Sequence, residues 1–331
     1  YEKAVVTKII KDNLAEDGSR YGTQKVLVKM TTGTYKGKEK QAINPSGTLF
    51  GADCKVGARI IVIVNKSGTN TGFTVYSQDR TMAIYGFALI FAAVVCAIGG
   101  KKGVYAILSL VFAFACIIGI MFPMMYRGIS PIVLTIIVAV LTTIVTLGLL
   151  GGYSSKTVSA ILGTAIGVVI AAVAAMAFGK AAGITGYNVS DIEALNYVGQ
   201  NTKIKIGELL FAGIIISALG AVMDVGMSIA STIQEIYETD KTLSMKRLFV
   251  SGINVGRDMM GTMTNTLIFA YVGGAMTTLV INYAYDLSYR QLANSYVIGI
   301  EIMQGLSGSL GVVLTVPITA LIASFLAVRK K

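Results

Sequence analysis

One carboxylate in this chain falls where a hydrocarbon environment is expected. Asp224 lies inside the apolar segment 206–230, whose other side chains are mostly aliphatic or small. A charged side chain at the centre of a membrane-spanning helix costs about 2.5–3.5 kcal/mol on insertion scales, whereas a hydrogen bond between membrane helices contributes about 0.6 kcal/mol on average. Because helix packing alone does not offset that cost, Asp224 is the first candidate for a functional group, one that binds and releases a cation.

Small and polar side chains recur around Asp224 at steps of three or four residues, which place them on one face of a helix. The same spacing occurs in the two apolar segments that follow. The three faces consist of Gly213, Ser217, Gly220, Asp224, Ser228, Ser231 and Glu235; of Asn254, Asp258, Gly261 and Asn265; and of Glu301, Gln304, Gly308, Gly311 and Thr315. Lipid does not solvate such faces, so we expect them to turn toward one another, or toward the equivalent faces of a partner chain, and to enclose a polar pathway.

These faces supply two candidate groups of site residues. The group predicted to relay a cation consists of Asp224, Asp258, Asn265 and Ser228. The group predicted to line the pathway consists of Ser217, Gly220, Ser231, Arg257, Asn254, Gly261, Gln304 and Thr315.

A structural interpretation competes for several of these positions. Small residues let membrane helices approach closely, and serine, threonine and asparagine hydrogen-bond between helices. The positions that this explains well are Gly213, Ser217, Gly220 and Gly308. Arg257 and Asp258 could form an ordinary ion pair at the membrane surface, and we expect Glu208 and Glu301 to be solvated near the outer surface.

The composition argues against several other chemistries. The chain has no histidine, which excludes imidazole metal ligation and histidine proton relays. Two of its three cysteines, Cys96 and Cys116, lie in apolar runs, so neither a disulfide framework nor a thiolate metal site is indicated. No phosphate-binding loop of the GxxxxGK[ST] type occurs. We therefore expect no enzymatic activity and no bound metal or cofactor.

The elements that must carry these faces are membrane-spanning helices. The chain has 331 residues, of which 54% are hydrophobic, and its mean hydropathy is +0.70. A bilayer-spanning helix needs about 20 apolar residues, and about seven runs approach that length. The predicted spans are residues 82–98, 103–122, 129–150, 157–178, 206–230, 262–283 and 306–328. This pattern predicts a polytopic α-helical membrane domain over residues 81–331, in contact with the lipid bilayer.

The net charge of +11 is explained better by membrane orientation than by nucleic acid. The basic residues form no patch with interleaved aromatic residues, so no nucleic-acid partner is expected. Tight basic clusters occur around Lys101, Lys241 and Lys331. The positive-inside rule places these clusters, and with them the C-terminus, in the cytoplasm, and the N-terminal domain outside.

Three local patterns add detail to the membrane domain. Ser190-x-x-Glu193 has the form of a capping box and predicts a brief interfacial helix after the fourth span. Segment 243–260 predicts an amphipathic inner helix that leads into the sixth span. In the fourth span, Gly163 and Gly167 have the GxxxG spacing that allows close helix contact.

Residues 1–80 differ from the rest, because they are polar and rich in glycine, threonine and lysine. Short β-branched runs separated by turn signals such as Thr32-Gly33 predict about five strands in a small antiparallel barrel of the OB or SH3 type. With 13 basic and 7 acidic residues, the barrel could bind an anion or an oligonucleotide, but a solvated docking or gating domain is favoured. The chain opens without Met on a residue that leads into a strand, so we expect that an upstream signal anchor has been removed.

Several stretches of the chain resemble the YibE/F family of bacterial membrane proteins. They are LGAVMDVGMSIASTIQEI, SGINVGRDMMGTMTNTLIFAYVGG, SGSLGVVLTVPITA and, in the N-terminal domain, Tyr35-Lys36-Gly37-Lys38-Glu39. The resemblance extends over nearly the whole chain and implies a multi-pass protein of the bacterial inner membrane.

A second resemblance concerns the order of elements around Asp224. A small-residue helix with an embedded Asp, a basic amphipathic connection and a helix that opens on Asn and Thr follow one another. This order is similar to that of SecDF and related RND-type transporters. By that similarity, Asp224 is the proton or sodium relay and Asn265 is its neighbour.

Together these observations predict a secondary transporter, or a transport-coupled membrane machine, that uses a proton or a sodium ion at Asp224. The sequence contains no motif that identifies the substrate. Two other classes stay open. One is a non-transporting assembly or docking factor, whose barrel binds a partner and whose polar helix faces form an oligomer or partner interface. The other is a passive channel.

Overall fold

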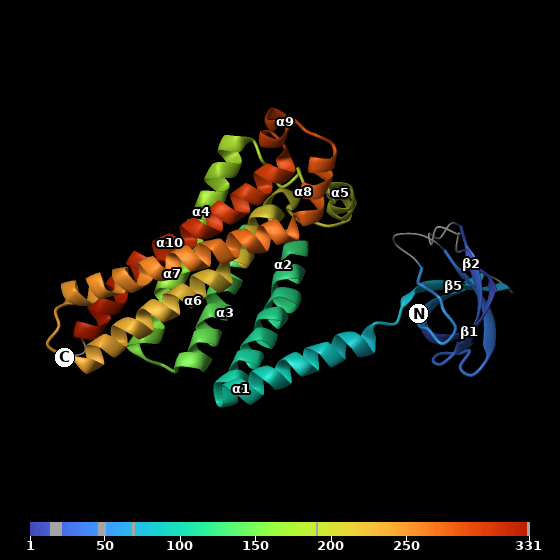
Figure 1. The fold of residues 1–331 in the computed structure, drawn as a ribbon, viewed down its shortest axis with the longest axis horizontal. Coiled ribbons are helices and arrows are strands. Elements are labelled where there is room, and N and C mark those ends of the chain that lie inside the picture. Colours follow the sequence, from blue (N-terminus) through green and yellow to red (C-terminus); the bar gives the residue numbers. More distant parts are fainter. Residues whose placement is uncertain (14–21, 46–50, 68–69, 190, 330–331) are drawn as a thin grey trace. The chain divides into compact units, whose positions relative to one another are not determined.

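The N-terminal part of the chain forms a closed five-stranded barrel (Figure 1). The structure is a computed structural model that describes residues 1–331 except 14–21, 46–50, 68–69, 190 and 330–331. It divides into two compact units, Tyr1–Val94 and Val95–Lys331. The strands are β1 (Glu2–Lys11), β2 (Gln24–Met30), β3 (Glu39–Asn44), β4 (Arg59–Ser67) and β5 (Asn70–Gln78).

The strand order identifies the barrel as the OB type rather than the SH3 type. Around the barrel the order is β1-β2-β3-β5-β4. β3 and β5 pair in parallel, whereas the other neighbouring pairs are antiparallel. A small Greek-key barrel with five strands is the architecture of the OB-fold. The predicted β-barrel is thus confirmed, and the expectation of a wholly antiparallel barrel is corrected at the β3–β5 pair.

Alternating burial explains which strands were visible in the sequence. In β2 the side chains of Val26, Val28 and Met30 are buried, and the residues between them lie nearer the solvent. Apolar residues at every second position are the signature of a half-buried strand. β3 lacks this signature, because its buried positions hold only the small Ala42 and the polar Asn44.

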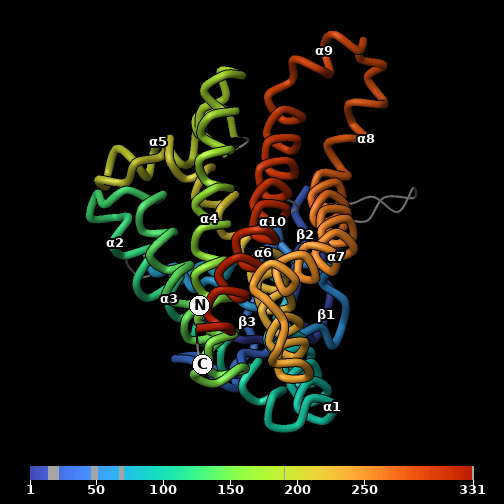
Figure 2. The backbone as a smooth tube through the Cα atoms, turned by 90° about the vertical axis from the view of Figure 1, so that its left-hand side faces the viewer, coloured from blue at the N-terminus to red at the C-terminus, as the bar shows by residue number. Residues whose placement is uncertain are grey.

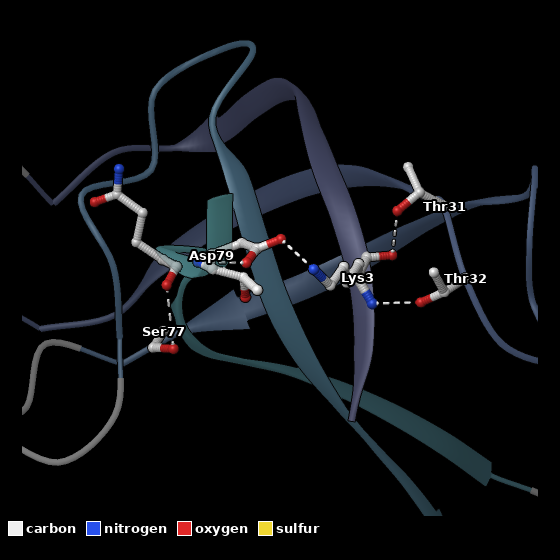
Figure 3. A network of polar contacts seen from close by, with 7 residues as sticks. Lys3, Thr31, Thr32, Ser77 and Asp79 are labelled. Atoms are coloured by element: carbon white, nitrogen blue, oxygen red, sulfur yellow. Dashed lines mark hydrogen bonds and ion pairs between the residues drawn. The ribbon is translucent and has the colours of Figure 1, made fainter. Parts of the chain in front are cut away.

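A polar network joins the first strand of the barrel to the residues that follow its last strand (Figure 3). The Lys3 main-chain N–H donates to Thr32 Oγ1 at 2.7 Å, and the Lys3 ammonium lies 2.9 Å from Asp79 Oδ2. Asp79 Oδ1 accepts the main-chain N–H of Thr81, the first residue of α1, at 3.1 Å. Hydrogen bonds with Thr81 and Lys3 lower the pKa of Asp79 from 3.8 to about 2.

Asp79 is therefore expected to make barrel stability depend on acidity. Because folding lowers its pKa, its contribution is fully present above pH 3.8 and is lost as the pH falls toward 2. Asp79→Asn should weaken the barrel at neutral pH, and the difference from wild type should shrink near pH 2. With Cys96 and Cys116 replaced by alanine, the readout is the rate at which a dithiodipyridine reagent, which reacts in acid, modifies the buried Cys54 thiol of the barrel core.

Glu39→Gln, at an exposed carboxylate of β3, is the matched control and should leave Cys54 as protected as in wild type. If Asp79→Asn exposed Cys54 to the same extent at every pH, the charge of the Asp79 carboxylate would not be what stabilises the barrel.

The second unit is helical. The first helix, α1 (Thr81–Cys116), begins in the first unit and continues into the second. The elements that follow it are the π-helix η1 (Ile117–Met121), α2 (Phe122–Tyr126), α3 (Pro131–Gly151), α4 (Ser155–Ala182), α5 (Ile192–Asn201), the 3-10 helix η2 (Ile206–Glu208), α6 (Leu209–Thr239), α7 (Met245–Gly274), α8 (Met276–Ala284), α9 (Tyr289–Ala293) and α10 (Tyr296–Arg329).

Five helical stretches among the described residues are long and apolar enough to span a bilayer, or six if α7 and α8 form one bent span. The first of them, Thr81–Tyr126, contains both of the first two predicted spans. Its backbone leaves the helical conformation at Gly100, with φ 55° and ψ −131°. A residue with positive φ is tolerated best as glycine, so Gly100 is suited to separate two helical segments. The chain is a multi-pass membrane protein.

Two predicted spans differ from the observed helices. Predicted span 262–283 is divided by a bend of 61° between α7 and α8. The last helix, α10, begins at Tyr296 rather than near residue 306. Its first turns were missed because Glu301 and Gln304 interrupt the apolar signal there.

The local helix predictions are closer to the structure. The segment expected as an amphipathic helix, 243–260, forms the first half of α7, continuous with the helix that follows. The brief helix expected after the fourth span is α5, which begins after Asp191. Ser190, the first residue of the predicted capping box, lies outside the described residues.

Glycines of α4 let α10 approach closely, as the GxxxG spacing predicted. α10 packs against α4, α6 and α7, and α4 packs against α6; α4 and α10 run side by side in Figure 2. A Cβ atom at Gly163 would overlap Thr319 Oγ1, and one at Gly167 would overlap Thr315 Oγ1. The spacing of these two helices therefore depends on the absence of side chains at both glycines.

We expect Gly167→Ala to lower the free energy of unfolding by about 1–3 kcal/mol, because the added methyl group must push α10 away. Gly148→Ala in α3 is the matched control, since a Cβ there meets no heavy atom within 4 Å. Denaturation in mixed micelles would compare the two variants with wild type. If both variants were as stable as wild type, the α4–α10 contact would not be limited by Gly167.

Candidate functional site

A polar face of α6 points out of the chain rather than into the helix bundle. Its residues, which we call the α6 stripe, are the exposed Gly213, Ser217, Gly220, Asp224 and Glu235 and the half-buried Ser228 and Ser231. The opposite face of the helix is buried at Val222, Gly226 and Ile229. That face contacts α4, α7 and α10, so packing on one side fixes the outward direction of the stripe.

α7 has a similar outward polar face. Its residues, which we call the α7 stripe, are Asn254, Arg257, Asp258, Gly261 and Asn265, and all five are exposed. Leu248, Gly252 and Gly256 on the other side of the helix are buried. A Cβ atom at Gly256 would overlap Val316 of α10 and contact Ile229 of α6. The close contacts of α7 thus leave its polar residues on the outside of the single chain.

α10 does not share this arrangement. Thr315 is fully buried and donates a hydrogen bond to the Gly311 carbonyl at 2.7 Å. It faces Gly167 of α4 and Gly226 of α6, on the side of α6 opposite to Asp224. Gln304 is half-buried. The expectation that three polar faces turn toward one another within one chain is therefore corrected: α6, α7 and α10 pack together, but Thr315 lies in the packed interior, away from the two stripes.

Antiparallel pairing sets the levels of the two stripes relative to each other. Tyr271 donates a hydrogen bond to Ser217 Oγ at 2.9 Å, and Ile229 packs near Gly256. Ile233 packs near Gly252 in the same register. The two helices run in opposite directions, so the numbers of two residues that face each other have nearly the same sum all along the pair. Along the helix axis, Asp224 is therefore level with residues 261–264, next in height to Gly261 and Asn265 of the α7 stripe. By the same register, Ser228 is nearly level with Asp258.

The acidic groups of the stripes have no partners within the described part of the chain. No hydrogen bond or ion pair is formed there by the carboxylate of Asp224 or of Asp258, and Arg257 forms no ion pair with its neighbour Asp258. The described residues contain no group of three or more His, Cys, Asp or Glu side chains that could hold a metal ion. What the stripes offer is single carboxylates flanked by glycine and hydroxyl side chains, an arrangement that suits a monovalent cation or a proton.

Tyr271 was missed as a site residue by the sequence reasoning. Its hydroxyl reaches Ser217, a member of the α6 stripe, from the C-terminal half of α7. A tyrosine in an apolar helix has no distinguishing sequence signal. Its only hint was its place on α7, about two turns beyond Asn265.

The outward direction of the α6 stripe predicts contact with water rather than lipid. In a chain whose three cysteines are replaced by alanine, Gly220→Cys should react with a membrane-impermeant maleimide. Val222→Cys, buried on the opposite face, should not react, and neither should Ile137→Cys, which is 56% exposed on the apolar surface of α3. Reaction at 137 and 220 to the same extent would contradict a water-lined stripe.

Comparison with known proteins places the helical part of the chain in one family. A family model described as YibE/F-like protein matches residues 87–329. Neither a curated protein nor a solved structure matches the chain. The matched region includes α6, α7 and α10 with both stripes, whereas the barrel lies before it. The chain belongs to the YibE/F-like family.

Proposed function

We propose that this protein is a membrane transporter that couples the movement of a substrate to a proton or a sodium ion bound at Asp224. The observation that carries the proposal is a carboxylate without a partner among the described residues, on the outward polar face of a helix that is apolar enough to span a bilayer. Hydrocarbon cannot solvate this group, so it must face a water-filled cavity or another protein. Intramembrane carboxylates in such positions mark ion pathways and proton relays.

The residues near Asp224 suit a cation that binds and dissociates reversibly. Gly220 and Ser228 lie one turn away on either side, so one leaves space and the other supplies a hydroxyl oxygen. Asn265 and Asp258 on α7 lie at nearby levels and add further oxygen atoms to the same stretch of the pathway. No Lys or Arg occurs on the α6 stripe to neutralise Asp224 permanently.

A second candidate function is a non-transporting assembly or docking factor. It is favoured by the position of both stripes on the outside of a single chain, where a second copy or another membrane protein could cover them. In that case the carboxylates would be partnered across an interface and would not exchange ions.

We further propose that the protein lies in the bacterial inner membrane with its barrel outside and its C-terminus in the cytoplasm. The basic residues around Lys101, Lys241 and Arg329 support this orientation through the positive-inside rule. Maleimide labelling from the outside at position 101 or 241 would contradict it.

The decisive variant is Asp224→Asn, which keeps the shape and hydrogen-bonding capacity of the side chain but removes its charge. Reconstituted vesicles under an imposed proton or sodium gradient should show an ion flux with the wild-type chain, and Asp224→Asn should reduce it by at least about tenfold. The variant should still insert and fold, because the cost of a membrane-buried charge is removed.

Asp191→Asn is the matched control, since Asp191 is an exposed residue next to α5 whose side chain forms no cap hydrogen bond. It should transport like wild type. Full flux in Asp224→Asn would point to a channel or to an ion site elsewhere. An absence of flux in every chain, with a stable oligomer that Asp224→Leu disrupts, would support the assembly factor.

A further inference from the structure

A pocket of about 250 Å³ lies between α7, α8 and the first turns of α10, apart from the two stripes. The 61° bend between α7 and α8 shapes it, with Ala275 at the bend. In both overall views these elements gather at the same end of the helical unit (Figures 1 and 2). The volume lies just below the range of about 300–1,000 Å³ that is typical of pockets for drug-sized ligands, so a compact ligand fits.

The wall of the pocket is almost entirely hydrocarbon. Ile268, Leu279, Ile302 and Leu306 contribute aliphatic side chains from three helices. The single ionisable carboxylate in the wall is that of Glu301, which is half-buried and forms no hydrogen bond or ion pair within the described residues. Among the described residues no Lys or Arg lines the pocket, so none of them neutralises Glu301 in its wall.

Tyr271 lines the pocket and also contacts α6. Its hydroxyl is held by Ser217 at 2.9 Å, so it presents its ring rather than a free donor to the pocket. Ser217 belongs to the α6 stripe and lies about two turns from Asp224. The pocket is thereby connected through one hydrogen bond to the helix that carries the proposed ion site.

We propose that this pocket binds a compact organic cation with an apolar body, such as an alkyl amine. Aliphatic walls favour a hydrocarbon body, and an unpaired carboxylate among them favours a cationic head, because a buried charge is stabilised when it is paired. An anion would meet Glu301 without any basic side chain to hold it. A neutral acyl chain would cover the carboxylate and leave it without a partner. A metal ion would find one carboxylate only.

If the transport function proposed above is correct, this cation is the class of its substrate. The binding itself does not depend on that function. Asp224→Asn should retain saturable binding to the pocket, so failure of the ion flux and failure of the pocket give different results.

The test is direct binding of radiolabelled decylamine to the full chain in nanodiscs of zwitterionic lipid, with empty nanodiscs as background. Decanoate and decanol, which share the chain length but are anionic and neutral, serve as competitors. We expect decylamine to bind saturably and the two competitors to displace it poorly. Glu301→Gln should raise the dissociation constant by about tenfold or more, since a charge-assisted contact is lost.

Two further variants separate charge from folding. Gly305→Leu should fill the pocket from α10 while leaving Glu301 in place, and it should also abolish binding. A Cβ atom at Gly305 meets its nearest neighbour, Tyr271, at 3.7 Å, so Gly305→Ala fits without displacement and shows whether the helix tolerates substitution there. Glu193→Gln, at an exposed carboxylate of α5, should bind like wild type.

Decanol and decanoate could instead displace radiolabelled decylamine as effectively as unlabelled decylamine does. That result would identify a groove for lipid tails and overturn the proposal. The same conclusion would follow if Glu301→Gln bound decylamine as tightly as the wild-type chain.

Discussion

The helical unit depends on one constraint, which is that polar groups within a bilayer must find partners inside the protein or in enclosed water. Several threonine and serine side chains meet it locally, by donating to a carbonyl of their own helix. Thr142 donates to the Val138 carbonyl at 2.8 Å, and Thr315 donates to the Gly311 carbonyl at 2.7 Å. A carboxylate cannot do this, because an ionised carboxylate only accepts hydrogen bonds and helix N–H groups are already used. Asp224 is thus the group that requires something beyond its own helix.

Packing on the opposite side of α6 determines the direction in which the Asp224 side chain points. Gly226 has no side chain, and a Cβ atom there would lie 2.8 Å from Thr164 Oγ1 of α4. Val222 and Ile229 are fully buried on the same side, so α6 is held in a single rotation about its axis. Because Asp224 lies about 200° around the helix from Gly226, close packing at the glycine turns the carboxylate outward. Packing and the candidate site are therefore two consequences of one helix orientation.

The barrel and the helical unit are stabilised by different interactions. The barrel buries a small core of alternating strand residues and is tied to Thr81 by Asp79, a contact that depends on charge. The helical unit uses glycine and small hydroxyl residues to bring helices close, and it keeps its unpaired carboxylates for the outward stripes. The bend at Ala275 adds a third feature, since an apolar pocket that includes Glu301 lies beside it.

The sequence by itself determined the class, the two-part organisation and the polar faces of α6 and α7, because apolar runs and helical spacing are local properties of the chain. It also identified Asp224, since a carboxylate in an apolar run is visible without any neighbours. Only the tertiary structure decided which way each face points. Spacing gives a side chain's angle about its own helix axis, not the helix that covers it, and small residues serve close packing and pathway lining equally well. That is why Thr315 was grouped with Asp224 although it lies against α4. It is also why Glu301, expected in solvent, lies in an apolar pocket whose walls come from helices that only the fold brings together.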